Sequence, residues 1–184
     1  MDEPADLASV KVLANPLRQR ILAQLAQDGE ATSTTLAAKL GVTTGGTSYN
    51  LRVLAEHGFV EEIPDRASGR ERWWRSADRS LRFPPYREQS AAMRAAMDEL
   101  NQLWFEQDLE AMARFFQARD SLGAWSDALP YSRGSIRVTL AELREFFEEY
   151  LALLQRFNRP DEEVPDDART VLTHFVAFPE TAGE

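Results

Sequence analysis

Apolar residues recur at spacings of three and four positions through the first third of the chain, with polar residues between them. Leu17, Ile21 and Leu25 follow this period, which places them on one face of a helix. Gly41 and Gly58 interrupt the pattern, because glycine readily takes the backbone conformation that ends a helix. The pattern predicts four helices, over residues 6–14, 16–27, 33–40 and 45–57.

Polar residues suited to capping stand where three of these helices should begin. Asn15 precedes Pro16, and a capping side chain followed by proline is typical of a helix start. We expect Ser33 or Thr34 to cap the third helix and Thr44 to cap the fourth. Only a few residues then connect these two helices, which is the spacing of a helix-turn-helix.

The pattern changes to that of a β-hairpin after Gly58. Residues 59–63 are expected to form one strand, residues 64–69 a turn and residues 71–75 the returning strand. Trp73 and Trp74 point to opposite faces of a strand, so one of them should lie in the core.

The segment Phe83-Pro84-Pro85-Tyr86 is rigid, and we place a domain boundary there. It separates an expected domain of residues 1–83 from a second region, residues 84–184. The fold class expected is mainly α with a small β content (α+β). In the second region we expect a long helix over 87–119, a short strand over 134–138, a helix over 139–157 and a terminal strand over 170–178.

The long helix carries an apolar face that is wider than one neighbouring element requires. We interpret this face as core and dimer interface, and the part that stays uncovered as room for a small apolar ligand. The residues assigned to the dimer interface are Met93, Met97, Leu100, Trp104, Leu109, Met112 and Phe116.

Charge is distributed unevenly along the chain. The net charge is −9, of which residues 1–87 carry +1 and residues 88–184 carry −10. Between Arg66 and Arg87, seven arginines face two acidic residues, which leaves a local charge of +5. A basic patch on an acidic body binds nucleic acid in one orientation and repels it in others.

Composition narrows the functional class further. The chain has no cysteine, which removes disulfides, thiolate nucleophiles and thiolate metal sites. The sequence shows neither an apolar stretch of membrane-spanning length nor a signal-peptide pattern, so we expect a cytoplasmic protein that does not interact with membranes. No motif joins a nucleophile, a base and an orienting acid, so we expect neither an enzyme nor a bound cofactor.

The order of elements is that of a DNA-docking domain, in which a helix enters the major groove and a basic wing follows the backbone. Residues 13–75 resemble the ArsR-type winged-helix regulators. The motifs that carry the resemblance are Leu13-Ala-Asn-Pro-Leu-Arg-Gln-Arg-Ile-Leu22, Leu36-Ala-Ala-Lys-Leu-Gly41, Ser48-Tyr-Asn-Leu-Arg-Val-Leu54, His57-Gly-Phe-Val-Glu-Glu62 and Gly69-Arg-Glu-Arg-Trp-Trp-Arg75. The resemblance implies a homodimer that binds a near-palindromic operator on double-stranded DNA, usually as a repressor. Residues 87–184 look more loosely like the extended C-terminal region of one subgroup.

The chain departs from that family in its metal-binding positions. The third helix has neither Cys nor His, and residues 87–119 contain no His. Asn50 stands where many relatives have His, and Thr47 where they have an aliphatic residue. The resemblance therefore implies DNA binding without metal sensing.

We expect the helix 45–57 and the wing 64–72 to contact DNA. The residues assigned to this contact are Thr44, Gly45, Gly46, Ser48, Tyr49, Asn50, Arg52, Arg66, Arg70 and Arg72. Two alternatives stay open. The acidic net charge and the scarcity of lysine favour a protein-interaction module, and His57 and His174 with carboxylates would suit a metal-responsive regulator.

Overall fold

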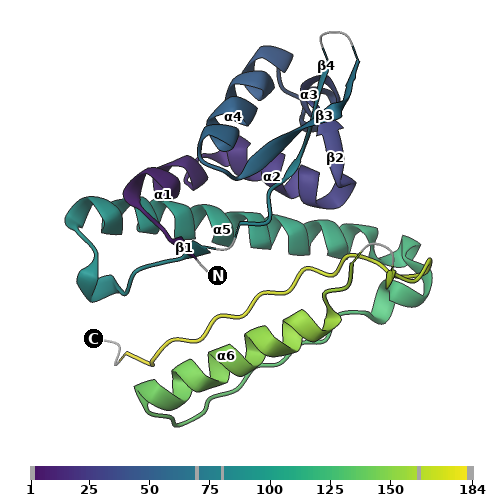
Figure 1. The fold of residues 1–184 in the computed structure, drawn as a ribbon. Helices are drawn as coiled ribbons and strands as arrows, with labels where there is room; N and C mark the ends of the chain where they lie inside the picture. The colour runs from purple at the N-terminus through teal and green to yellow at the C-terminus, as the bar shows by residue number, and fades with distance from the viewer. Residues whose placement is uncertain (1–2, 69–70, 80, 161–162, 182–184) are drawn as a thin grey trace. The chain divides into compact units, whose positions relative to one another are not determined.

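Two units make up the chain, Met1–Phe115 and Phe116–Glu184, and each is described by itself. The structure is a computed structural model that describes residues 3–68, 71–79, 81–160 and 163–181 (Figure 1). The first unit extends past the boundary expected after residue 83, because Met93, Ala96 and Leu100 complete its core.

Short helices form most of the first unit, and they begin and end close to the predicted positions. They are α1 (Leu7–Leu13), α2 (Pro16–Asp28), α3 (Ser33–Leu40) and α4 (Thr44–Glu56), followed by the 3-10 turn η1 (Tyr86–Glu88) and the long helix α5 (Ala91–Ala118). Asn15 caps α2 as predicted, by accepting a hydrogen bond from the backbone N–H of Arg18 at 3.1 Å.

The caps of α3 and α4 were predicted one or two positions too late. Thr32 caps α3 and accepts from the backbone N–H of Thr35 at 3.2 Å. Thr43 caps α4 and accepts from the backbone N–H of Gly46 at 3.2 Å. In both helices a run of Ser and Thr offers several candidates, and the cap is the one whose side chain reaches the N–H three positions onward.

A three-stranded antiparallel sheet packs beside these helices, in the order β2-β4-β3. Its strands are β2 (Glu30–Thr32), β3 (Val60–Ser68) and β4 (Glu71–Ser76), and Trp74 of β4 lies opposite Ala31 and Glu62. The sequence pattern did not reveal β2, and the predicted turn at 64–69 is strand as far as Ser68. A second, parallel pair joins β1 (Glu3–Pro4) to β5 (Leu81–Arg82).

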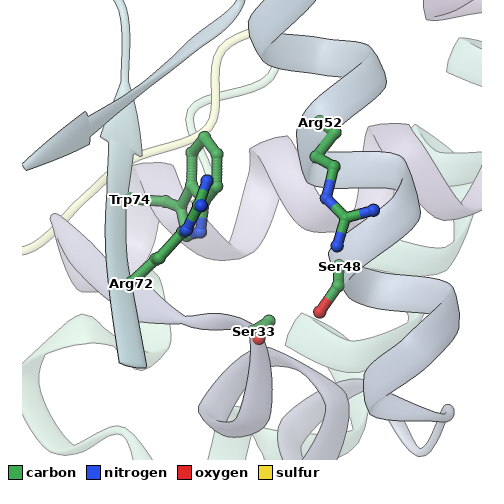
Figure 2. Close-up of a pocket in the computed structure, with 5 residues that line it drawn as sticks. All are labelled: Ser33, Ser48, Arg52, Arg72 and Trp74. Atoms are coloured by element: carbon green, nitrogen blue, oxygen red, sulfur yellow. The ribbon is translucent and has the colours of Figure 1, made fainter. Parts of the chain in front are cut away.

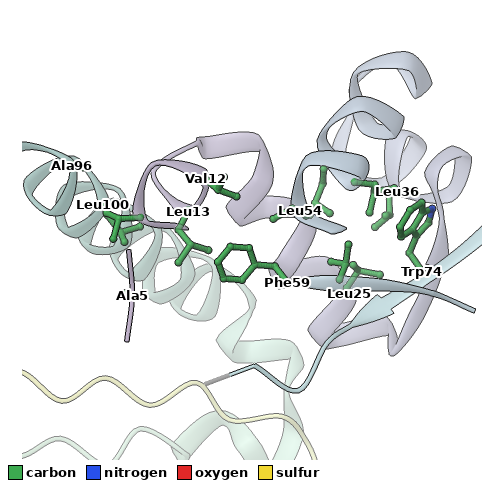
Figure 3. Close-up of a cluster of buried hydrophobic side chains, with 14 of the residues drawn as sticks. Ala5, Val12, Leu13, Leu25, Leu36, Leu54, Phe59, Trp74, Ala96 and Leu100 are labelled. Carbon is green, nitrogen blue, oxygen red and sulfur yellow. The ribbon is translucent and has the colours of Figure 1, made fainter. Parts of the chain in front are cut away.

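The core of the first unit is apolar and continuous (Figure 3). Leu36, Leu51 and Leu54 are fully buried, and Trp74 covers them from the sheet. The prediction that one of the paired tryptophans is a core residue is therefore confirmed. On the other side of the core, Leu100 of α5 packs into the cluster that contains Val10 and Leu13 of α1.

The second unit contains one long helix, α6 (Leu140–Phe157), preceded by the 3-10 turns η2 (Arg119–Ser121) and η3 (Gly123–Asp127). The predicted capping box is confirmed, since Thr139 and Glu142 bond each other's backbone N–H groups. Residues 134–138 and 170–178 were predicted as strands, but neither has a strand neighbour and neither is a strand.

Aromatic rings hold the extended C-terminal segment against α6. The ring of Phe175 lies 4.8 Å from that of Tyr150 and 5.9 Å from that of Phe147. No described residue of this unit is buried, although α6 is strongly amphipathic.

Candidate nucleic-acid interface

The turn between α3 and α4 is set by local backbone chemistry. Gly41 takes a left-handed conformation (φ 66°), and the backbone N–H of Val42 donates to the carbonyl of Ala37 at 3.0 Å. Thr43 then begins α4 through its capping bond. Leu36 and Leu51 bury the faces where the two helices meet, which leaves the opposite face of α4 toward solvent.

The exposed face of α4 carries several of the predicted contact residues. Tyr49 is 63% exposed, Thr44, Gly45 and Arg52 are exposed, and Ser48 is half-buried. A Cβ added to Gly45 would meet no atom of the chain within 4 Å. The absence of a side chain at Gly45 is therefore not required by packing within the described part of the protein.

Asn50 is predicted to contact DNA, and in the structure its side chain bonds within its own helix. It is only 9% exposed, and its Nδ2 donates to the carbonyl of Gly46 at 2.9 Å. Gly46 is itself half-buried in the first turn of the helix, and a Cβ there would lie 3.1 Å from Oγ1 of the capping Thr43. Asn50 and Gly46 therefore bond to each other within the first turns of α4.

A polar hollow lies where α3, α4 and β4 meet, and Figure 2 shows the side chains that line it. Arg52 and Ser48 enter from α4, Arg72 from the facing strand, and Ser33 from the start of α3. Trp74 closes the side formed by β4, and the five lining residues include no carboxylate. The hollow thus gathers hydrogen-bond donors from three elements that are separate in sequence.

The arginines of the wing are not a one-signed patch, which corrects the interpretation of the local charge of +5. Arg72 pairs with Glu62 at 3.2 Å and Arg75 pairs with Glu61 at 2.5 Å. Arg66 pairs with Glu30 of β2, and its guanidinium lies 5.3 Å from the centre of the Trp73 ring. The antiparallel register brings these carboxylates beside the arginines, so β2 and β3 offset much of the charge of the wing.

The strand separates two predicted contact residues onto different faces. Arg72 and Trp74 are two positions apart and share the face that borders the hollow. Arg66 stacks on Trp73, which belongs to the other face. The structure therefore brings Ser48, Arg52 and Arg72 together and leaves Arg66 apart from them. Arg70 lies outside the described residues.

Two polar residues near this surface escaped the sequence interpretation. Ser33 was considered only as a cap, although it lines the hollow. Burial lowers the pKa of the Arg18 guanidinium on α2 from the ordinary value, and Tyr49 of α4 lies close enough to contribute to its electrostatic environment. Its Nε is buried without a hydrogen-bond partner in the described part of the chain. Only the three-dimensional proximity of α2 to α4 would have indicated Arg18.

The residues assigned to a dimer interface fall into two groups. Met93 and Leu100 are buried within the core of the first unit, and Met97 and Trp104 pack partly against it, so contacts within the chain account for these four. The members that stay exposed lie further along the helix and are Leu109, Met112 and Phe116.

Neither histidine belongs to a metal-binding group that the structure reveals. Nδ1 of His57 donates to the carbonyl of Val53 at 3.0 Å. Within residues 3–68, 71–79, 81–160 and 163–181, no three His, Asp or Glu side chains gather in a way that suits a metal ion. None of the helices in these ranges is both long and apolar enough to cross a bilayer.

Comparison with known proteins agrees with this geometry. Residues 13–63 match the family model described as a helix-turn-helix domain. The chain has a winged helix-turn-helix fold. No curated protein matches it.

Solved structures with similar arrangements come from bacteria. A possible transcriptional regulatory protein from Mycobacterium bovis (fragment 1–100) is 27% identical, with 55% of this chain and 85% of that chain covered and a TM-score of 0.34. The adhesin competence repressor AdcR from Streptococcus pyogenes is 12% identical, with 78% and 80% covered and a TM-score of 0.35. ZitR from Lactococcus lactis, in the apo form of a mutant, is 16% identical, with 79% and 84% covered and a TM-score of 0.34. TM-scores of this size carry no weight for function, which is inferred below from the chain itself.

Proposed function

We propose that this protein is a sequence-specific DNA-binding transcription regulator. The observation that carries the proposal is the exposed face of α4, which borders a hollow lined by Arg52 and Arg72 and by no carboxylate. An α-helix with its side chains is about 10–12 Å wide, and the major groove of DNA is about 12 Å wide. The helix α4 enters the groove, and β3 and β4 follow the adjacent backbone.

Gly45 supports this proposal independently. Glycine in the first turn of a helix costs stability relative to alanine, by up to about 1 kcal/mol. Nothing in the described structure occupies the space where its Cβ would lie. A phosphate backbone that approaches this turn closely gives a physical reason for a residue with no side chain.

Homodimerisation is part of the proposal, and the end of α5 supplies the surface. Leu109 is 68% exposed and Met112 is 43% exposed, and they lie three positions apart on one face of the helix. A second copy that covers this face would place two α4 helices on successive half-sites of a near-palindromic operator. Replacing both residues with arginine should give a monomer in sedimentation velocity, whereas Gln102→Arg on the polar face should leave the assembly unchanged.

Repression and its relief by a ligand are further parts of the hypothesis. Bound protein would block transcription from the operator, and a small apolar ligand would release it. The exposed apolar side chains of the second unit support this idea. A panel of apolar metabolites should then include one that raises the melting temperature and lowers DNA affinity.

Fluorescence anisotropy on the DNA upstream of the coding region tests the central proposal. We expect tight binding to the native sequence, weak binding to a scrambled control, and affinity that falls steeply as salt concentration rises. Equal and weak binding to both DNAs at all salt concentrations would refute sequence-specific recognition.

A second candidate, a protein-interaction module, draws support from the paired arginines of the wing. Because Glu30, Glu61 and Glu62 offset Arg66, Arg75 and Arg72, this surface is less basic than its sequence indicates. A partner protein recovered by pull-down whose binding is lost in Tyr49→Ala, together with no DNA binding, would favour this candidate.

A further inference from the structure

We propose that the hollow lined by Ser33, Ser48, Arg52 and Arg72 binds a single phosphate group. Side chains of α3, α4 and the wing contact this phosphate together. This inference rests on the proposed function when the phosphate belongs to the backbone of DNA. A phosphate on a free ligand has the same chemistry, and the experiments below distinguish the two sources.

The five lining residues include no carboxylate, and the carboxylate that bonds Arg72, that of Glu62, is not among them. Figure 2 shows Arg72 on the side of the hollow formed by β4 and Arg52 on the side formed by α4, with the hydroxyls of Ser48 and Ser33 below them in this view. Guanidinium groups bind phosphate oxygens in a forked geometry, and hydroxyls add shorter-range bonds. The unesterified oxygens of a phosphate can accept hydrogen bonds from these four side chains, which come from three elements.

The start of α3 adds to the positive potential of the hollow. Ser33 is the first residue of this helix, and Thr32 already satisfies the N–H of Thr35. The remaining amides of the first turn carry the positive end of the helix dipole, which favours an anion. This contribution is secondary to the two arginines, which carry full charges.

Trp74 makes the hollow a better anion site than an open surface. Its indole is 6% exposed and forms the wall beside Arg72. A wall without water lowers the local dielectric, so each interaction between a guanidinium and a phosphate is stronger there.

The two arginines differ in their ion pairing before any phosphate binds. Arg52 has no ion pair with any described residue, whereas Arg72 is bonded to Glu62 through Nη1. A guanidinium has five N–H donors, so Arg72 can retain Glu62 with one nitrogen while others turn to the phosphate. Glu62 then orients Arg72 and also reduces its attraction for anions.

A mutant cycle that combines protein variants with modified DNA tests whether Arg52 and Arg72 bind the same phosphate. Each phosphate of the operator is replaced in turn by an uncharged methylphosphonate, and affinity is measured for the parent protein, Arg52→Gln, Arg72→Gln and Ser33→Ala. One phosphate per half-site should exist whose neutralisation weakens the parent roughly tenfold and weakens the two arginine variants much less. Arg75→Gln, which changes a wing arginine paired with Glu61, should behave like the parent at that position.

Coupling of Arg52 and Arg72 to different phosphates, or to none, would overturn the proposal while leaving DNA binding intact. Circular dichroism of each variant guards against a loss of folding. The proposed function fails separately, if no DNA is bound specifically.

In that case, titration with inorganic phosphate shows whether the hollow binds phosphate in the absence of DNA. Nitrogen-15 NMR of the full chain should show saturable shifts at the Nε signals of Arg52 and Arg72 and at the indole of Trp74. The shifts should be absent in Arg52→Gln and Arg72→Gln and present in Arg75→Gln. Such a result without DNA binding assigns the site to a free phosphate-bearing ligand, and a titration without shifts at these groups refutes the site.

Discussion

The indole N–H of Trp104 donates to the side-chain oxygen of Gln19 across 3.3 Å, although the two residues are 85 positions apart in sequence. The amide nitrogen of Gln19 donates in turn to the carbonyl of Leu13 at 2.9 Å. This polar link lies at the edge of the apolar core and joins α5 to α2 and to the end of α1. Phe83 packs edge-on against Trp104 with 5.9 Å between ring centres, which completes the attachment of α5.

Removal of the Gln19 side chain should destabilise the first unit. Gln19→Ala leaves the carbonyl of Leu13 and the N–H of Trp104 without partners in a half-buried position, so we expect the free energy of unfolding to fall by about 1–3 kcal/mol. Urea unfolding followed by tryptophan fluorescence measures this change. Gln27→Ala, which removes an exposed glutamine of the same helix, should change stability by less than about 0.5 kcal/mol. Equal effects would show that the link contributes nothing specific.

Gly45→Ala should separate stability from DNA affinity. Alanine adds helix propensity where no atom of the described chain obstructs it, so thermal stability should rise by about 0.5–1 kcal/mol. The same methyl group should hinder the approach of a phosphate backbone and weaken DNA binding. Gly134→Ala, also unobstructed but in the second unit, serves as the control for affinity. An alanine variant that is more stable and binds DNA as well as the parent would contradict close approach at Gly45.

Glu62→Gln should strengthen binding to DNA of any sequence. The substitution removes the negative charge that offsets Arg72, so the surface presents one more net positive charge to phosphates. We expect the slope of log affinity against log salt concentration to steepen by about one unit. Glu71→Gln changes the net charge equally, but Glu71 has no ion pair among the described residues and should have a smaller effect. If the two variants behave alike, net charge alone is responsible.

Asp6 should contribute to the dependence of stability on pH. Its carboxylate accepts the backbone N–H of Ser9 at 2.7 Å as the cap of α1, and this bond lowers the pKa of Asp6 below 3.8. Because the pKa is lower in the folded state than in the unfolded state, the stabilisation is complete above about pH 5 and is lost as pH falls through the folded value.

Two substitutions of Asp6 distinguish capping from other acid effects. Asp6→Asn retains an acceptor oxygen that does not titrate, so its unfolding midpoint should fall less than that of the parent between pH 5 and pH 2. Asp6→Ala should be less stable than the parent at pH 7, and the difference should shrink as pH falls. Parallel curves for all three proteins would exclude a titrating cap.

The helices and the hairpin follow from local signals in the sequence. Period and capping chemistry specify α2, α3, α4 and α6 to within a few residues at each end, because those signals act over a single turn. The strand β2 escaped detection because three residues, Glu30–Thr32, carry no period of their own and become a strand only by pairing with β4. Residues 170–178 show the converse, since strand-forming side chains do not make a strand without a neighbour.

The exposed positions on α4 could be predicted for the same reason, and the ion pairs of the wing could not. Ser48, Tyr49 and Arg52 follow from the position of Leu51 and Leu54 on the buried face. The internal bond of Asn50 was not predicted, because an amide at the edge of that face bonds to the carbonyl of its own helix by a choice of rotamer that the period does not determine. The partners of Arg66 and Arg72 depend on strand register, which joins residues far apart in the chain.

The orientation of Asn50 reduces the number of side chains on α4 that can form base-specific hydrogen bonds. If α4 enters the groove with Asn50 bonded inside its helix and Arg52 on a phosphate, as proposed above, the bases meet chiefly Thr44, Ser48 and Tyr49. None of these side chains makes the paired hydrogen bonds by which arginine selects guanine or asparagine selects adenine. Each half-site would then be a degenerate sequence, and most of the discrimination would come from the separation of two half-sites and from the local stiffness and groove width of the DNA.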